Sequence, residues 1–246
     1  MLLLQNAISK CTVVSILLFS VTRTPAGIGS NKERTQVREE TTQDSGWRGS
    51  RNFWLDAAYE AFVGKGIEAV KIANLAKELK IARTSFYWHF KDRNALLDAL
   101  WELWSQRTTV PLLRAIEAES DSAAHAMLNV IGCFVGADGF DSQMEFAIRG
   151  WALADPVILD RLRQEDEMRL EALASLFRQL GKGELEADVR ARNLYLVQIG
   201  YISMQVRETL ETRIDRVPHY VEIFSDEKPT SEEMNVFCRQ MVAAAI

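Results

Sequence analysis

The sequence predicts an all-α protein in which a small N-terminal three-helix domain with a helix-turn-helix precedes a larger helical body. Two observations predict this class. Apolar residues recur at α-helical spacing along most of the chain, and no alternating pattern is long enough to predict a β-sheet. The composition, with 48% hydrophobic residues, 13 Gly and 5 Pro among 246 residues, is that of a globular chain with a sizeable core. The predicted boundaries are 1–45 for an N-terminal extension, 46–107 for the first domain and 108–246 for the second.

Residues 1–45 do not fit the pattern of the rest of the chain. Cys11 to Val21 is a mostly apolar run, too short to span a bilayer as a helix, and it resembles the apolar part of a signal peptide. Asn31 to Gly46 is polar and charged, which is typical of disorder. Three interpretations stay open: a genuine anchor, a disordered extension, or a chain start assigned upstream of the true one.

The segment from residue 72 to residue 90 predicts two short helices joined by a tight turn. Apolar residues in its first half lie at i, i+3, i+4 and i+7 and therefore form one buried stripe. These residues are Ile72, Leu75, Ala76 and Leu79. Ile81 can fill the corner between the helices, while Phe86 and Phe90, four residues apart, point back into the core.

The opposite face of the second short helix carries hydroxyl, cationic and aromatic side chains. Groups of this kind hydrogen-bond phosphate oxygens and base edges when a helix lies in the major groove. Exposed aromatic rings beside basic residues also indicate a ligand or a polyanion as partner. We therefore predict a DNA-binding surface. Its residues are Lys71, Arg83, Thr84, Ser85, Tyr87, Trp88, His89 and Lys91.

Residues 48–100 resemble the DNA-binding domain of the TetR (tetracycline-repressor-like) transcriptional regulators. The resemblance rests on the aromatic first helix, the break at Gly64 to Gly66, and above all the run Phe86-Tyr87-Trp88-His89-Phe90 followed by Lys91-Asp92-Arg93. It implies a homodimer that binds a double-stranded, roughly palindromic DNA operator and responds to a small-molecule effector. The last two long helices of such proteins pair with those of the second copy.

Three positions depart from the family pattern. Lys71 replaces Thr or Ser, Lys80 replaces the Gly of the turn, and Ala82 replaces Ser before the recognition helix. We expect Lys80 in the left-handed conformation that Gly adopts freely. Ala82 leaves the helix uncapped, at a cost of about 1 kcal/mol.

Charge is distributed unevenly between the two predicted domains. Residues 46–107 contain ten Lys and Arg against seven Asp and Glu, a net charge of +3, whereas residues 108–246 carry −9. The whole chain, at −5, would argue against a nucleic-acid partner, but the positive end coincides with the motif.

The body predicts helices over residues 93–108, 122–135, 142–153, 156–180 and 187–210, and a last helix around 234–245. Large apolar side chains on these helices are the candidates for an effector pocket. They are Trp101, Trp104, Phe134, Met144, Phe146, Trp151 and Tyr195. The residues assigned to a dimer interface follow from the resemblance, and the same stripes could equally face the chain's own core. They are Leu194, Val197, Tyr201, Met204, Met234, Phe237 and Met241.

Catalytic motifs are absent from the sequence: there is no P-loop, GxGxxG or HExxH, and no Ser or Cys nucleophile with His at a recognisable spacing. His89, His125 and His219 form no metal cluster by spacing, so we predict neither a metal nor a cofactor. Three separated Cys without a CxxC indicate a reducing compartment.

The sequence thus predicts a cytoplasmic, non-enzymatic, ligand-responsive regulator, most simply a repressor. Two alternatives stay open. One is a helical ligand-binding or interaction module that has lost DNA binding. The other is a membrane-tethered sensor that uses residues 2–21 as its anchor.

Overall fold

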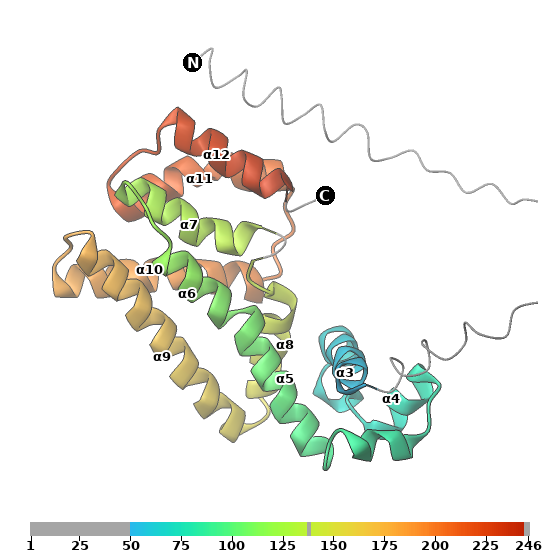
Figure 1. The fold of residues 1–246 in the computed structure, drawn as a ribbon. Helices are drawn as coiled ribbons and strands as arrows, with labels where there is room; N and C mark the ends of the chain where they lie inside the picture. The colour runs from blue at the N-terminus through green and yellow to red at the C-terminus, as the bar shows by residue number, and fades with distance from the viewer. Residues whose placement is uncertain (1–49, 137–138, 244–246) are drawn as a thin grey trace, which may run out of the picture. The chain divides into compact units, whose positions relative to one another are not determined.

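The structure, a computed structural model, describes residues 50–136 and 139–243 (Figure 1). Its regular elements in these ranges are α-helices and two 3-10 helices, which confirms the all-α prediction. The N-terminal elements are α3 (Arg51–Lys65), η1 (Ile67–Ala69), α4 (Ile72–Leu79) and η2 (Arg83–Trp88). The following helices are α5 (Arg93–Arg107), α6 (Thr109–Glu117), α7 (Ala123–Val135), α8 (Ser142–Ala152), α9 (Pro156–Gln179), α10 (Glu184–Ser203), α11 (Leu210–Ser225) and α12 (Ser231–Ala243). The interpretations offered for residues 1–45 lie outside the described residues.

Side-chain caps fix the starts of several helices. The Asp92 carboxylate accepts a hydrogen bond from Ala95 N at the start of α5. Asp155 does the same for the first turn of α9, whose first residue is Pro156. Both caps confirm the sequence prediction, because a short acceptor before the first turn satisfies amides that have no partner within the helix.

The helix boundaries differ from the prediction at two places. α5 ends at Arg107, within one residue of the predicted end, but a helix that was not predicted, α6, begins at Thr109 and contains Pro111 in its first turn. The predicted helix 187–210 covers 184–203, and residues 210–225 form α11, which the sequence analysis did not predict. Pro218 lies inside α11, and because it has no backbone N–H it removes one hydrogen bond that a helix usually makes.

Two hydrophobic cores run through the described residues. The first contains Trp54, Phe62 and Phe86 from the N-terminal elements, and it continues through α5 into α8 and the start of α9. Phe62 meets Trp151 of α8 edge to face, with ring centroids 6.0 Å apart, so α8 lies beside α3 (Figure 1). The apolar contact between the two parts therefore extends across the predicted boundary at residues 107 and 108.

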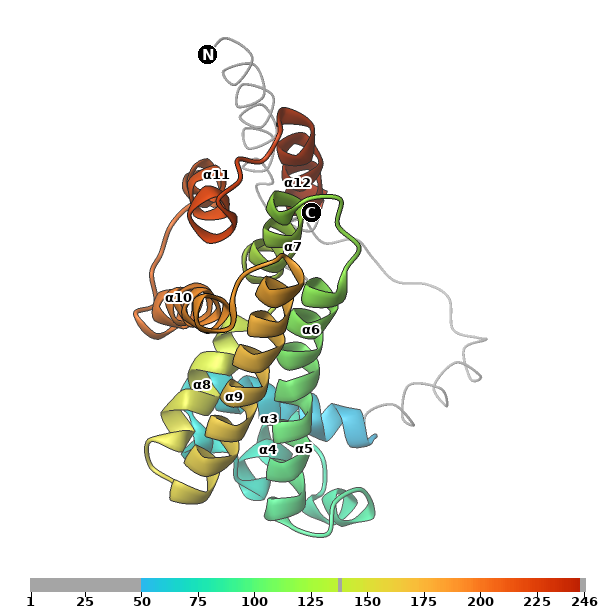
Figure 2. The same ribbon diagram turned by 90° about the vertical axis from the view of Figure 1, so that its left-hand side faces the viewer.

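The second core is built around α7, which packs against α6, α11 and α12 (Figure 2). Its small residue Gly132 allows α12 to approach, since a Cβ built there would lie 3.2 Å from the Phe237 ring. Within the described ranges, no helix combines the length and apolar character needed to cross a bilayer.

Candidate nucleic-acid interface

The turn between α4 and η2 is made by Lys80 in the left-handed conformation, with φ 56° and ψ 39°. Its amide donates to carbonyl oxygens of the last turn of α4, and Ile81 N donates to Ala76 O at 3.1 Å. These bonds give partners to backbone carbonyl groups at the end of α4. A left-handed Gly usually makes the same bonds at a helix end. The expectation for Lys80 is confirmed, and a side chain in this region costs about 1 kcal/mol or more.

η2 is anchored by Phe86, which is fully buried. The Phe86 ring meets Trp54 edge to face at 5.2 Å and stacks on Phe90 at 5.4 Å. As expected, Ala82 provides no side-chain cap. The segment forms a 3-10 helix rather than an α-helix, and Ser85 Oγ donates to Ala82 O at 2.8 Å within it.

The anchoring of Phe86 directs the two following aromatic residues outward. Tyr87 is 54% exposed and Trp88 is 82% exposed, although both rings are large enough to stabilise a core. Arg83 and Lys91 are also exposed, and neither has an ion-pair partner among the described residues. The structure thus brings two uncovered rings and two unpaired cations together around η2.

The other four predicted contact residues differ in their exposure and partners. Thr84 is exposed, while Ser85 and His89 are half-buried. Lys71 precedes α4 and forms an exposed ion pair with Glu68 at 3.5 Å. A pair of this kind contributes little to stability, so the Lys71 ammonium can exchange its partner for a phosphate.

Three further basic residues of the N-terminal part were not assigned to the predicted DNA-binding surface. Arg93 donates to Val70 O at 2.6 Å and to Ile67 O at 3.0 Å, so it ties η1 to α5. The Arg51 guanidinium lies 5.0 Å from the centre of the Phe90 ring. Lys65 lines an open cleft of about 480 Å³ together with Lys77 of α4 and Lys80 of the turn. These three lysines add positive charge to the domain. No local sequence pattern could have predicted these contacts, because each is made with a residue at least 20 positions away or on another helix.

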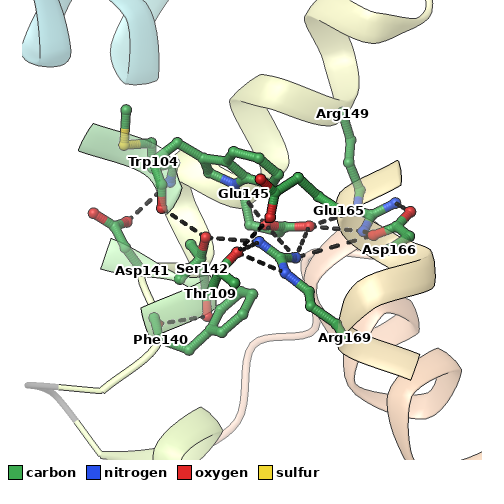
Figure 3. A network of polar contacts seen from close by, with 12 residues as sticks. Trp104, Thr109, Phe140, Asp141, Ser142, Glu145, Arg149, Glu165, Asp166 and Arg169 are labelled. Carbon is green, nitrogen blue, oxygen red and sulfur yellow. Dashed lines mark hydrogen bonds and ion pairs between the residues drawn. The ribbon is translucent and has the colours of Figure 1, made fainter. Parts of the chain in front are cut away.

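In the body, a buried polar cluster surrounds Arg169 of α9 (Figure 3). We call it the Arg169 cluster; it also contains Trp104, Thr108, Thr109, Glu145, Arg149, Asp166 and Tyr195. Arg169 and Glu145 are both fully buried and form an ion pair at 3.3 Å. Trp104 Nε1 donates to Glu145 Oε2 at 2.7 Å, and the Arg169 guanidinium lies 4.6 Å from the centre of the Trp104 ring.

Every donor group of Arg169 has an acceptor. Nε donates to Thr109 Oγ1 at 3.0 Å, Nη2 donates to Thr108 Oγ1 at 2.8 Å, and Nη1 donates to Tyr195 Oη at 2.9 Å. Burial, the largest single influence, lowers the pKa of Arg169, but Glu145, Tyr195 and Asp166 together raise it by more, so this pKa lies above its usual value. The cluster joins α5 and α6 to α8, α9 and α10.

A second polar contact joins α3 to the body. Tyr59 Oη of α3 donates to Asp141 Oδ2 at 2.9 Å, and the other oxygen of Asp141 caps α8 by accepting from Met144 N. The Arg107 guanidinium lies 4.4 Å from the centre of the Tyr59 ring and 3.6 Å from the Asp141 carboxylate. Burial and the hydrogen bond to Asp141 raise the pKa of Tyr59 to about 12.

The residues predicted for an effector pocket lie in different surroundings. Trp104 and Tyr195 belong to the Arg169 cluster, where their polar atoms are bonded within the chain. Trp101, Met144 and Trp151 lie in the first core. Phe134 packs on Phe140 in the second core, with ring centroids 4.7 Å apart, whereas Phe146 is 41% exposed. Their assignment to a pocket stays a prediction.

The residues predicted for a dimer interface also lie in different surroundings. Leu194, Phe237 and Met241 are buried in the second core, which is the alternative that the sequence left open. Val197, Tyr201 and Met234 are half-buried, and Met204 is 78% exposed. The large apolar residues that α10 exposes are Leu185, Val189 and Leu196. The sequence alone did not single them out, because helical spacing is the same for a core stripe and for an interface.

Comparison with known proteins agrees with this geometry. Residues 55–100 match the family model described as "Bacterial regulatory proteins, tetR family". The chain is 35% identical over 54 residues to the HTH-type transcriptional regulator AcrR of Shigella flexneri, covering 22% of this chain and 25% of that protein. It is 42% identical over 51 residues to the tetracycline repressor protein class D of Escherichia coli, covering 21% and 23%. The matched part therefore spans about a quarter of these relatives.

The likeness in fold extends further along the chain. A solved structure from Rhodococcus sp. assigned to the TetR-family transcriptional regulators superposes with a TM-score of 0.57 at 17% identity, covering 71% of this chain and 98% of that one. At this identity the superposition speaks for the fold alone. Residues 55–100, in which Tyr87 and Trp88 lie exposed on an anchored η2, thus match the DNA-binding region of the tetR family of bacterial regulatory proteins.

Proposed function

We propose that this protein is a DNA-binding transcriptional regulator that acts as a homodimer on a roughly palindromic operator and responds to a small-molecule effector. The observation that carries the proposal is the surface of η2, where exposed Tyr87 and Trp88 lie beside Arg83 and Lys91 without partners in the described part of the chain. A folded protein gains little by exposing two large rings next to unpaired cations unless another molecule covers them. The proposed activity is non-enzymatic and belongs in the cytoplasm, where operator DNA is accessible.

The chemistry of the surface divides into two kinds of contact. Lys71, Lys91 and the hydroxyls of Thr84 and Tyr87 are suited to phosphate oxygens, which position a protein on the duplex without reading its sequence. Arg83 can bond the O6 and N7 atoms of guanine through two N–H groups, and Trp88 can contact a thymine methyl. We assign sequence preference to Arg83 and Trp88 and general affinity to the others.

Two copies are needed to read two half-sites, and the exposed face of α10 is the surface we propose for their pairing. Leu185, Val189, Leu196 and Met204 lie along this face at helical spacing, and all are exposed. Phe237 and Met241 are not part of this proposal, because they cover Gly132 within their own chain.

A substitution on α10 tests the pairing. Leu196 is 59% exposed, so Leu196→Glu leaves the core intact while placing a charge in the proposed interface, and we expect monomers with unchanged helical circular dichroism. Val157→Glu, at an exposed apolar position on α9, is the matched control and should stay dimeric. Sedimentation velocity measures both, and a monomeric wild type would reject the dimer.

The contacts of α3 with the body suggest how an effector could act on DNA binding. Tyr59 and Phe62 join α3 to the N-terminal and C-terminal ends of α8, and the Arg169 cluster joins α8 to α9 and α10. A shift of α8 would therefore move α3 and change the separation of two recognition elements, which must match half-sites about 34 Å apart. Coupling of this kind has a free energy of about 1 to 3 kcal/mol.

An electrophoretic mobility shift against DNA from upstream of the protein's own gene tests DNA binding. We expect a shift that competitor DNA of random sequence does not remove and that weakens steeply with salt, as phosphate contacts require. The absence of any preference for that DNA would favour the alternative of a helical module that has lost DNA binding. The uncapped η2 and the left-handed Lys80 are the observations that keep this alternative open.

A further inference from the structure

A small cavity lies between α7, α10 and α11, and it shares no residue with the Arg169 cluster. Ile131 and Val135 of α7 and Val217 of α11 form its apolar part. α10 contributes Gln198 and Tyr201, and α11 contributes Tyr220 and two arginines. The cavity therefore combines an apolar floor with polar and cationic groups, which is the usual composition of a small-molecule site.

Three polar groups at or beside this cavity lack the partners that buried groups normally have. Gln198 is only 5% exposed, and its carboxamide has no hydrogen-bond partner in residues 50–136 and 139–243. Glu208 Oε2 is buried without a partner, although the other oxygen of the same carboxylate binds Arg216. Since more than nine in ten buried polar groups in proteins are hydrogen-bonded, Glu208 Oε2 is an unsatisfied acceptor beside the cavity, to which a bound donor could hydrogen-bond.

The third group is the guanidinium of Arg213. It forms no ion pair with any described residue, and its nearest aromatic contact is the Tyr201 ring, 5.5 Å away. Arg216, by contrast, is already paired with Glu208. Arg213 is thus the available cation of the cavity, and a planar guanidinium binds a carboxylate through two parallel N–H bonds.

Two tyrosines, Tyr201 and Tyr220, line the cavity. Their hydroxyl groups lie 3.1 Å apart, and the enclosed volume is about 20 Å³, which is enough for one water molecule. A larger ligand requires Tyr201 and Tyr220 to part. Their rings would then lie on either side of it, and a planar ring is the shape that two aromatic side chains accommodate best.

We propose that this cavity binds a small aromatic carboxylate that also carries a hydrogen-bond donor. The carboxylate would pair with Arg213, the ring would lie between Tyr201 and Tyr220 above Ile131 and Val217, and the donor would satisfy Glu208 Oε2 or Gln198. The inference rests on the proposed function for its regulatory meaning, because it gives the chemical class of the effector. The binding site itself is tested without DNA.

Isothermal titration calorimetry of the full chain with para-hydroxybenzoate tests the site. We expect wild-type protein to bind, and Arg213→Met and Gln198→Leu each to weaken binding about tenfold or more, because each removes a hydrogen bond to a charged or buried group. Arg239→Gln, at an exposed position on α12, is the control and should bind like the wild type. Circular dichroism establishes that all variants are folded; Arg213 is half-exposed, so its substitution leaves the fold intact.

Two results would overturn the proposal. One is the absence of heat with wild-type protein at millimolar ligand, and the other is equal affinity in the wild type and both cavity variants. Benzamide, which has the same ring without the negative charge, should bind at least about tenfold more weakly than benzoate; equal affinities would overturn the carboxylate assignment. A mobility shift without ligand tests the proposed DNA binding separately, so failure there leaves the calorimetric result intact.

Discussion

The Arg169 cluster and the surface of η2 contain the same three kinds of side chain in opposite situations. In the cluster, Trp104 and Arg169 are fully buried, and the Tyr195 hydroxyl donates to Asp166 at 2.6 Å. On η2, the corresponding Trp88, Tyr87 and Arg83 are exposed, and no described residue bonds their polar atoms. The first set has its partners inside the chain, whereas the polar atoms of the second set are free for the outside partner that we propose.

This difference separates residues that stabilise the fold from residues that bind. A polar side chain with every bond made internally contributes to stability, and its loss leaves a buried partner unpaired. An exposed side chain without partners contributes little to folding, so its substitution should change binding alone. The cavity between α7, α10 and α11, which Gln198 lines, combines burial with missing partners. We therefore propose that a ligand binds there.

The largest expected effect belongs to Glu145 of the Arg169 cluster. Glu145→Ala leaves the fully buried Arg169 without its carboxylate, and we expect the free energy of unfolding to fall by about 3 to 5 kcal/mol. Urea unfolding followed by circular dichroism measures this change. Asp188→Ala, which breaks an exposed ion pair with Arg192, should change stability by no more than about 0.5 kcal/mol. Similar losses in the two variants would refute the distinction between the cluster and the surface.

The next effect concerns operator affinity. The double variant Tyr87→Ala, Trp88→Ala removes both exposed rings, and we expect a loss of about 1 to 3 kcal/mol in binding free energy with almost unchanged stability. Fluorescence anisotropy with labelled operator and thermal unfolding measure the two quantities. Leu153→Ala, at an exposed apolar position after α8, should alter neither. Unchanged operator affinity in the double variant would remove η2 from the binding surface.

A smaller effect is expected at Tyr59, which joins α3 to the cap of α8. Tyr59→Phe should lower the free energy of unfolding by about 1 kcal/mol, the contribution of one hydrogen bond. The pKa of Tyr59 is raised from 10.0 to about 12, so the folded state favours the neutral hydroxyl. Its contribution is complete below pH 10 and is lost as the pH rises towards 12. The difference between wild type and Tyr59→Phe in chemical denaturation should therefore narrow above pH 10, and a constant difference would contradict the assignment.

The smallest effect is expected at Glu233, which ties α12 to the start of α7. The Ser122 hydroxyl donates to Glu233 at 2.6 Å and holds the pKa of that carboxyl below its usual value of 4.5. A lowered pKa gives stability that is present above pH 4.5 and is lost as the pH falls through the folded value. Glu233→Gln should accordingly flatten the decline in melting temperature on acidification, whereas Glu60→Gln, at an exposed position on α3, should follow the wild type.

The sequence by itself determined the features that depend on neighbouring residues. Asp92 and Asp155 cap α5 and α9 because an acceptor three or fewer residues before an amide meets it in any helix start. Phe86 and Phe90 share a buried face because four residues make about one helical turn. Lys80 is left-handed, as expected from its place at the turn where the TetR pattern has Gly.

Only the tertiary structure decided the features that depend on distant residues. Glu145 is paired with a residue 24 positions away and with an indole 41 positions away, and no local spacing records such a match. Phe237 and Met241 pack into the core of their own chain because Gly132, on another helix, leaves room for them. Periodicity shows that a helix has an apolar face, but the element that covers this face is fixed by the packing of the whole chain.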